Sequence, residues 1–203
     1  MHKICISGKA KSGKGTLSKL LSKRFPSREG NHGIKPKLLR DGGCEVIAFA
    51  DPIKQIAQAM FPEAKYECLY GASELRENII DPKYKDKNGN ILTHRQALID
   101  IGTLGRSYNK DIWLNITKRL IETVFNKDLV IVNDIRFINE FEYLKTNNFF
   151  TIRIKRTDAA KINDISETQQ EDIPDSSFDC IIENNSSIEY LDNIVSGLIN
   201  KIA

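Results

Sequence analysis

The sequence predicts a three-layer α/β/α domain built around a five-stranded parallel sheet. Two observations support this fold class. Five short apolar runs, rich in β-branched residues, alternate with longer segments of helical periodicity. The runs are nearly continuous in apolar character, apart from charges in the fourth, as expected for strands buried on both faces of a parallel sheet. The five predicted strands are residues 3–7, 45–50, 129–133, 151–155 and 180–183.

The bulk properties fit one globular domain. A chain of 203 residues is long enough for a large core. Its net charge of +3 suits an anionic ligand but is too small to argue for a nucleic-acid-binding surface. The four cysteines show no close pair at metal-ligand spacing, and no apolar run could span a bilayer. We therefore expect a soluble, cytoplasmic protein without a membrane partner; a homodimer stays open, because no interface stripe is visible.

Helical periodicity follows several of the strands. The first helix directly follows the first strand and stops at Pro26, and further helical patterns cover 113–124 and 188–202. Ser186, with Glu189 three residues on, predicts a capping box for the last helix. Strands alternating with helices imply βαβ units, which bind ligands at the carboxyl ends of their strands.

Three stretches interrupt this alternation. Residues 27–43 form a Gly- and Lys-rich excursion, and 52–111 form a polar, helical insertion with a turn at 88–90. Residues 157–177 are strongly polar and too long for an ordinary connection, so we expect a lid there. We expect all three to belong to a single domain spanning 1–203.

The strongest motif lies between the first strand and the first helix. Glycines in this segment let the backbone turn with its N–H groups inward, which forms an anion cradle at a helix N-terminus. Lys14 would reach the β- and γ-phosphates of a nucleotide. The alternative is a Gly- and Lys-rich turn before an ordinary helix. The residues expected to contact ATP are Lys11, Ser12, Gly13, Lys14, Gly15 and Thr16.

The phosphate loop departs from the strict G-x-x-x-x-G-K-[ST] pattern at one position. Gly15 follows Lys14, and Thr16 supplies the hydroxyl one residue later. This Gly-Lys-Gly-Thr form resembles the loop of nucleotide monophosphate kinases such as adenylate kinase. Asp134, at the end of the third strand, could complete a Mg²⁺ site with Thr16 through a metal-bound water. The alternative is that Asp134 caps the next helix.

Transfer of a phosphoryl group onto another phosphate gathers several negative charges, which fixed guanidinium groups counter efficiently. Arg136 lies just past the third strand, and Arg156 ends the fourth. We expect both to act with Lys14 on the transferring group. Arg153 and Lys155 alternate with isoleucines along the fourth strand, which indicates edge or surface charges.

Four further motifs follow the phosphate loop in order along the chain. They are FADPIK at 49–54, RQALIDIGT at 95–103, DIW at 111–113 and DIRFINE at 134–140. Together they resemble the phage-type deoxynucleoside monophosphate kinases over nearly the whole chain. This resemblance implies the P-loop kinase fold, with ATP as donor, Mg²⁺ as cofactor and a deoxynucleoside monophosphate as acceptor.

The resemblance also implies an acceptor site in the insertion. Lys54 would contact the monophosphate, two arginines would clamp it, and Trp113 would help to shape the pocket. Asp51 would bind the acceptor sugar or organise water and Mg²⁺. As alternatives, Trp113 could be a core anchor, Arg76 a solvated charge and Asp51 a helix cap. The implied acceptor residues are Asp51, Lys54, Arg76, Arg95, Gly102 and Trp113.

Two further positions concern the donor side. In the lid, Asp164 stands where the family carries histidine, which leaves its role open. Asn184, in the turn after the fifth strand, would border the ATP base.

Two rival functions stay open at this point. The first is another small-molecule P-loop kinase, such as a dephospho-coenzyme A or phosphomevalonate kinase. The second is a regulatory or nucleic-acid-associated NTPase, which would need a clustered basic surface; residues 35–40 offer only a short one.

Overall fold

The computed structural model of the protein describes residues 1–26, 43–124, 126–157 and 169–202. The chain divides into two compact units. Unit 1 comprises Met1–Ala48 and Thr117–Ala203, and unit 2 comprises Phe49–Ile116. All of the predicted excursion except Gly43, and most of the predicted lid, including Asp164, lie outside the described residues.

Unit 1 is built on a five-stranded, all-parallel sheet with the strand order β2-β3-β1-β4-β5. The predicted parallel sheet is thereby confirmed. From the central β1 the chain builds β2 and β3 on one side and β4 and β5 on the other. The strands are β1 His2–Ser7, β2 Cys44–Ile47, β3 Leu129–Ile135, β4 Phe150–Lys155 and β5 Cys180–Glu183.

The second strand is shorter than predicted, because it ends at Ile47 and not at residue 50. The next helix, α2 (Asp51–Met60), begins close behind it with Pro52 in its first turn. Proline is favoured in the first turn of a helix, because its fixed φ suits the helix and because a backbone N–H in that turn would have no helical partner anyway.

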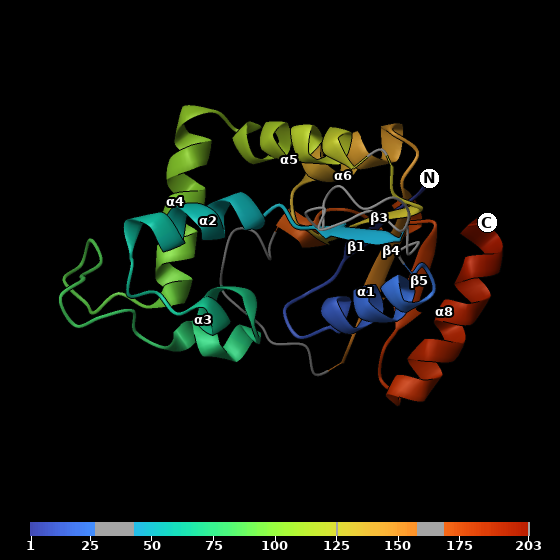
Figure 1. The fold of residues 1–203 in the computed structure, drawn as a ribbon, viewed down its shortest axis with the longest axis horizontal. Coiled ribbons are helices and arrows are strands. Elements are labelled where there is room, and N and C mark those ends of the chain that lie inside the picture. Colours follow the sequence, from blue (N-terminus) through green and yellow to red (C-terminus); the bar gives the residue numbers. More distant parts are fainter. Residues whose placement is uncertain (27–42, 125, 158–168, 203) are drawn as a thin grey trace, which may run out of the picture. The chain divides into compact units, whose positions relative to one another are not determined.

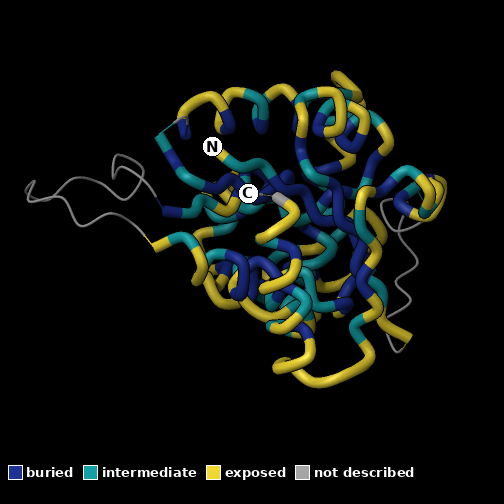
Figure 2. Tube along the Cα trace, turned by 90° about the vertical axis from the view of Figure 1, so that its right-hand side faces the viewer, coloured by how far each residue is buried: buried dark blue, intermediate teal, exposed yellow. Residues whose placement is uncertain are grey.

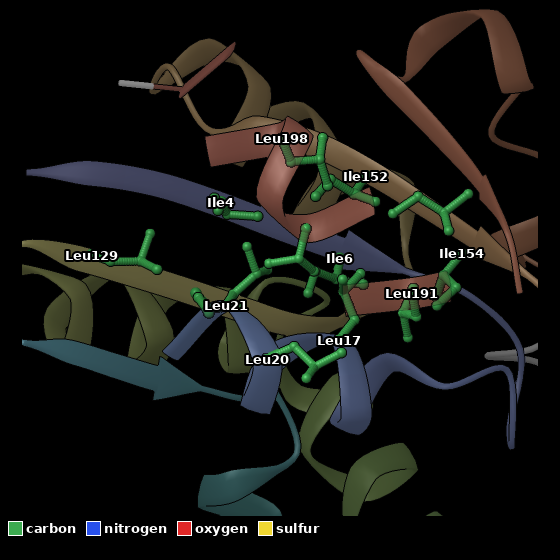
Figure 3. Packing of buried hydrophobic residues seen from close by; sticks show 13 residues of the cluster. Ile4, Ile6, Leu17, Leu20, Leu21, Leu129, Ile152, Ile154, Leu191 and Leu198 are labelled. Carbon is green, nitrogen blue, oxygen red and sulfur yellow. The ribbon is translucent and has the colours of Figure 1, made fainter. Parts of the chain in front are cut away.

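Helices cover both faces of the sheet, as a three-layer fold requires. Helices α1 (Lys14–Lys23) and α8 (Ile188–Ile202) lie on one face, and α6 (Ile138–Thr146) lies on the other (Figure 1). In the tube of Figure 2, helical turns alternate between buried and exposed residues. Figure 3 shows the core beneath α1 and α8, to which the strands and both helices contribute. Its members include Ile4, Ile6, Leu17, Leu21, Ile152, Ile154, Leu191 and Leu198.

Helix α8 spans the predicted residues, but its cap lies one residue later than predicted. Ser187 Oγ, and not that of Ser186, accepts the N–H of Tyr190 at 3.2 Å. The residue directly before the first helical residue is the one whose side chain can reach the N–H three positions on. The turn before it is held elsewhere, since Asn185 Oδ1 accepts the N–H of Thr157 at 2.8 Å.

Unit 2 is mainly helical and has a core of its own. A turn with Gly89 at φ 85° lies where the sequence predicts one. Antiparallel bridges, among them one between Lys85 and Ile91, pair the chain on either side of the turn. The buried cluster includes Ile53, Ala57, Leu69, Leu92, Ala97, Ile101 and Trp113. The elements of unit 2 are α2, α3 (Tyr66–Tyr70), η2 (Ser73–Glu77), α4 (His94–Tyr108) and the first residues of α5 (Ile112–Thr123).

None of the helices in the described part of the chain is long and apolar enough to cross a membrane.

Candidate functional site

The predicted phosphate loop connects β1 to α1 in unit 1. Lys11 has φ 62° and Gly13 has φ 106°, both in the left-handed region. Left-handed residues between right-handed ones turn successive N–H groups toward a common concavity, which binds anions. Gly13 is also the residue directly before α1, so the positive end of the helix dipole opens onto the same loop.

Two of the loop glycines are required by their neighbours. A Cβ on Gly13 would collide with Nδ2 of Asn184, and that amide donates to the carbonyl of Ser12 at 2.8 Å. A Cβ on Gly8 would lie 2.6 Å from Ser12 Oγ and would also collide with the carbonyl oxygen of Ile154. Asn184, which the resemblance places near the ATP base, therefore contacts the loop backbone directly.

Lys14 lies back across the loop that precedes it. Its Nζ donates to the carbonyl of Gly8 and, at 2.8 Å, to the carbonyl of Lys9. These carbonyls hold the ammonium charge against the backbone of the loop. An ammonium is a compact charge with three donors, which suits it to phosphate oxygens.

The carboxyl end of β3 carries the predicted Asp134 and Arg136. The register between β1 and β3 shifts here, because Cys5 pairs with Val132 but Ser7 pairs with Ile135. One extra residue in β3 makes a bulge, which locally re-aims side chains. Asp134 lies in this irregular stretch and is half-buried.

Glu140 fixes the turn that contains Arg136. Its Oε2 accepts the backbone N–H of Arg136 at 3.0 Å and that of Phe137 at 3.2 Å. Glu140 is buried. Its carboxylate accepts the backbone N–H of Phe137, the residue directly before α6, as the glutamate of a capping box does. It thus positions Arg136 through the main chain of that residue.

Arg153 is not the edge or surface charge that the alternation along its strand indicates. It is 8% exposed, and β4 lies between β1 and β5. Its guanidinium donates to Asp175 Oδ1 at 2.7 Å and to the carbonyl of Gln170 at 2.8 Å. The guanidinium also lies 4.3 Å from the ring centre of Phe178. The prediction was wrong because polar partners from a distant segment cover this face of β4.

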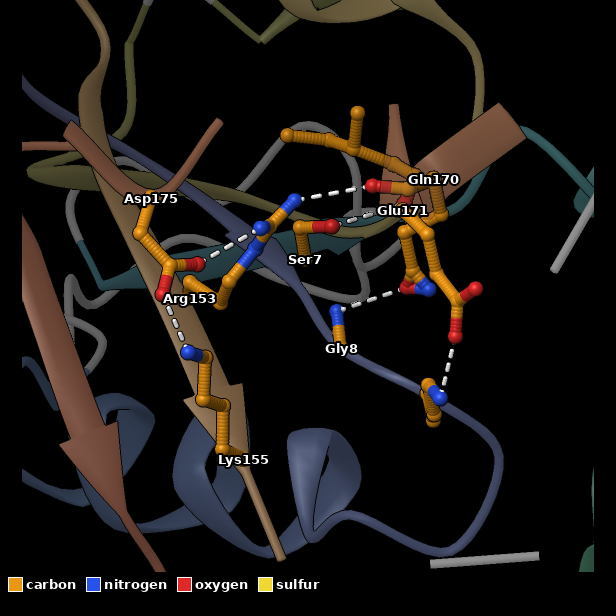
Figure 4. A network of polar contacts seen from close by, with 9 residues as sticks. Ser7, Gly8, Arg153, Lys155, Gln170, Glu171 and Asp175 are labelled. Atoms are coloured by element: carbon orange, nitrogen blue, oxygen red, sulfur yellow. Dashed lines mark hydrogen bonds and ion pairs between the residues drawn. The ribbon is translucent and has the colours of Figure 1, made fainter. Parts of the chain in front are cut away.

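Asp175, near the end of the predicted lid, pairs with two residues of β4. It pairs with Lys155 as well as with Arg153 (Figure 4). Hydrogen bonds from Lys155 and Arg153 lower the pKa of the Asp175 carboxyl below its ordinary value.

A pocket of about 340 Å³ opens at the carboxyl ends of β1 and β4. Four cationic side chains and two carboxylates line it, so the lining carries net positive charge and suits an anion. The predicted Ser12 and Arg156 both reach it. Gln170 and Glu171 were not predicted, since nothing distinguishes them within a polar segment. The lining residues are Gly8, Lys9, Ser12, Arg153, Ile154, Lys155, Arg156, Gln170, Glu171 and Asp175.

Unit 2 brings together two of the predicted acceptor residues. Lys54 Nζ lies 2.8 Å from Asp51 Oδ1 and 5.1 Å from the ring centre of Tyr70. Tyr70 stacks on Tyr66, with ring centres 4.5 Å apart. Burial, and then the charge of Asp51, raises the pKa of the Tyr70 hydroxyl. An ammonium, a carboxylate and two rings therefore form one cluster.

Of the two predicted clamp arginines, Arg76 lies in η2, and Arg95 lies in α4 and contacts η2. Arg95 pairs with Glu77 and donates to the carbonyl of Ser73 at 3.0 Å. Arg76 belongs to η2 and donates to the carbonyl of Leu69 at 3.5 Å, near the outer limit of a hydrogen bond.

Trp113 lies in the core of unit 2, where it is 3% exposed. Its Nε1 donates to the carbonyl of Gly102 at 3.0 Å, which brings two predicted residues into contact. Gly105 was not predicted, although a Cβ there would lie 2.8 Å from Cε2 of the Trp113 ring. Its spacing of three from Gly102 is the local signal that sequence reasoning could have used.

Two comparisons identify known proteins to which this chain is similar in sequence. The family model described as deoxynucleotide monophosphate kinase matches residues 95–195. The chain is also 28% identical, over 166 residues, to a protein of Acanthamoeba polyphaga mimivirus named "Putative deoxynucleotide monophosphate kinase". That match covers 75% of this chain and 82% of the viral protein. Both findings confirm the resemblance to these kinases, and both names indicate a kinase.

Proposed function

We propose that this chain is an ATP-dependent phosphotransferase that converts deoxynucleoside monophosphates to diphosphates. The observation that carries the proposal is the phosphate loop of unit 1, which combines left-handed turns, the N-terminus of α1 and the ammonium of Lys14. The family match supplies the acceptor class. Such an enzyme of nucleotide metabolism would act in the cytoplasm.

The donor side of the proposal lies in unit 1. The triphosphate of ATP would lie on the loop from Lys11 to Thr16, with Asn184 beside it. The hydroxyl of Thr16 and the carboxylate of Asp134 are the hard oxygen ligands that Mg²⁺ prefers, so these two residues would hold the ion together with the phosphates. Bound there, Mg²⁺ would neutralise part of the negative charge of the phosphates.

No side-chain nucleophile is needed for the transfer. An oxygen of the acceptor phosphate attacks the γ-phosphorus, and the bond from that phosphorus to the β,γ-bridging oxygen breaks, leaving ADP. The protein provides position and counter-charge. In this role Lys14, Arg136 and Arg156 would face the transferring group, with Arg136 fixed through Glu140.

The acceptor side of the proposal lies in unit 2. Lys54 would meet the monophosphate with Asp51 beside it, and Arg76 and Arg95 at η2 would supply two further charges. Gly102 and Trp113 would shape the pocket through the contact between them.

An ADP-release assay over a panel of acceptors tests the function. We expect turnover with at least one deoxynucleoside monophosphate. Turnover only with dephospho-coenzyme A or phosphomevalonate would assign a different small-molecule kinase. ATP hydrolysis that rises with DNA and ignores monophosphates would assign a regulatory or nucleic-acid-associated NTPase.

Lys14→Ala is the matched active-site control for this assay. We expect it to lower kcat by about 10²-fold or more, as the loss of a group that stabilises transition-state charge does. The thermal midpoint of the variant should stay close to that of the wild type, because Lys14 contacts loop carbonyls and not the core. Wild-type turnover in Lys14→Ala would remove the phosphate loop from the mechanism.

A further inference from the structure

Two buried polar atoms of the pocket lack a hydrogen-bond partner among the described residues. They are Nε2 of Gln170 and Oγ of Ser12, on residues that are 3% and 1% exposed. Buried polar groups in folded proteins are nearly always bonded, so each exception calls for an explanation. Both residues line the same positively charged pocket beside the phosphate loop.

Contacts on three sides fix Gln170 at this place (Figure 4). Its Oε1 accepts the backbone N–H of Gly8 at 3.1 Å. Its own carbonyl accepts from Arg153 at 2.8 Å, and its neighbour Glu171 pairs with Lys9. The residue is therefore held from both its main chain and its side chain, against β4 and against the loop.

The contact with Gly8 also determines which end of the carboxamide carries the free donor. A backbone N–H can bond only to the oxygen of the amide, so Oε1 faces Gly8 and Nε2 keeps both of its protons for another partner. Ser12 Oγ also lies beside Gly8, because a Cβ built on Gly8 would be 2.6 Å from it. Two unused polar groups thus flank Gly8.

The charges around these groups indicate what they bind. Lys9, Lys155 and Arg156 line the pocket together with Arg153, and only Glu171 and Asp175 oppose them. A ligand that accepts hydrogen bonds and carries negative charge satisfies both conditions. A phosphate group of the nucleotide on the adjacent loop has this chemistry.

We propose that Gln170 is a further ligand of the donor site: its Nε2 donates a hydrogen bond to a phosphate oxygen of the bound nucleoside triphosphate, beside the hydroxyl of Ser12. The inference rests on the proposed function and adds a residue from outside the phosphate loop. Arg153 is then a positioning residue, because it holds the main chain of Gln170.

Gln170→Glu tests this role, with Gln169→Glu as a matched control. Gln170→Glu keeps an oxygen for Gly8 but replaces the donor with a charged acceptor that repels phosphate. Gln169→Glu makes the same charge change one residue earlier, outside the pocket lining. By titration calorimetry with Mg-ATP, we expect Gln170→Glu to bind at least about tenfold more weakly than Gln169→Glu. Equal affinities would overturn the proposal and indicate that Nε2 bonds only water.

A measurement on the wild-type protein covers the case in which Gln170→Glu fails to fold. The side-chain ¹⁵NH₂ signal of Gln170 should shift when Mg-ATP is added, and its protons should exchange more slowly with water. The signal of Gln169 should stay unchanged. A Gln170 signal that does not respond to saturating Mg-ATP would overturn the assignment.

Failure of the inference can be told from failure of the proposed function. If the wild type neither binds ATP nor phosphorylates any monophosphate, the proposed function is wrong. If the wild type does both, and Gln170→Glu matches Gln169→Glu, only the role of Gln170 is wrong.

Discussion

The glycines of the phosphate loop differ in why they are there. Gly13 combines φ 106° with a collision between any Cβ and Asn184, so both its backbone and its surroundings exclude a side chain. Gly15 lies in the first turn of α1, and a Cβ there would meet nothing within 4 Å. The sequence motif does not distinguish these glycines, whereas their φ angles and their neighbours in the structure do.

Gly13→Ala and Gly15→Ala should therefore differ in their effect on the free energy of unfolding. We expect Gly13→Ala to lower the free energy of unfolding by about 1–3 kcal/mol, because alanine is strained at this φ and displaces Asn184. Gly15→Ala should leave it unchanged or raise it by up to about 1 kcal/mol, because alanine is the better helix former. Urea unfolding of the two variants measures both changes, and equal midpoints would contradict the assignment.

Single residues were predictable where their signal is local. The turn from β1 into α1 was predictable, because its glycines, the strand before them and the helix after them are contiguous in sequence. Arg153 and Gln170 were misread or missed, since they meet only when β4 and the chain around residue 170 come together. These two residues bond to each other but lie 17 positions apart in the sequence, and no periodicity links them.

At the level of elements, the end of β4 is tied to η3 (Asp175–Ser177) by charge. Arg153 and Lys155 both bond to Asp175, the first residue of η3. The same arginine holds Gln170, so one strand end organises the whole segment that borders the pocket. The contact between β4 and η3 should therefore weaken when Asp175 loses its charge.

We expect Asp175→Asn to remove part of the pH dependence of the free energy of unfolding. The folded pKa of Asp175 is lowered by Lys155 and Arg153, so its contribution is present above the unfolded pKa of about 4 and is lost as pH falls through the folded pKa. We expect Asp175→Asn to cost about 1 kcal/mol at pH 7, a small value because the carboxylate is 42% exposed and screened by solvent. Urea unfolding between pH 2 and 7 measures the difference.

The control for this prediction is Asp172→Asn, which changes an exposed aspartate three residues earlier in the chain. It should leave the unfolding midpoint nearly unchanged at every pH. A wild-type advantage over Asp175→Asn that persists undiminished at pH 2 would show that the charge of Asp175 is not what joins the two elements.

The elements themselves were largely predictable, and their ends were not. Near-continuous apolar runs predicted all five strands of the sheet, and the helical periodicity of apolar residues predicted α8. The third strand runs past the predicted Asn133 to Ile135, because its bulge lets β1 follow it further. Such boundaries depend on pairing partners, which a single run of sequence does not contain.

On the scale of the molecule, the residues of the two proposed sites separate cleanly. The donor residues all belong to unit 1, and the acceptor residues all belong to unit 2. The alternation of strands and helices predicted the sheet of unit 1. The insertion predicted at 52–111 falls within unit 2, which comprises Phe49–Ile116. The second limit lies beyond the predicted one, because α5 runs through the boundary without a break in its helical pattern.

This separation gives a test that follows unit 2 alone. Trp113 is the sole tryptophan of the chain and is buried in the core of unit 2, so its fluorescence reports the unfolding of that unit. A ligand at one hundred times its Kd stabilises the unit that it binds by about 2.7 kcal/mol. A deoxynucleoside monophosphate that the enzyme turns over should therefore raise the urea midpoint of Trp113 fluorescence by about 1 M or more.

Arg95→Ala provides the comparison, because the proposal places that guanidinium on the acceptor phosphate. Whatever the substitution does to the stability of unit 2 in the absence of ligand, the shift that the same monophosphate concentration produces should shrink, since the Kd rises. An equal shift in Arg95→Ala would remove this arginine from the acceptor site. A wild-type fluorescence transition that ignores an acceptor that it phosphorylates would contradict the placement of that site in unit 2, and binding would then have to be sought among the residues of unit 1.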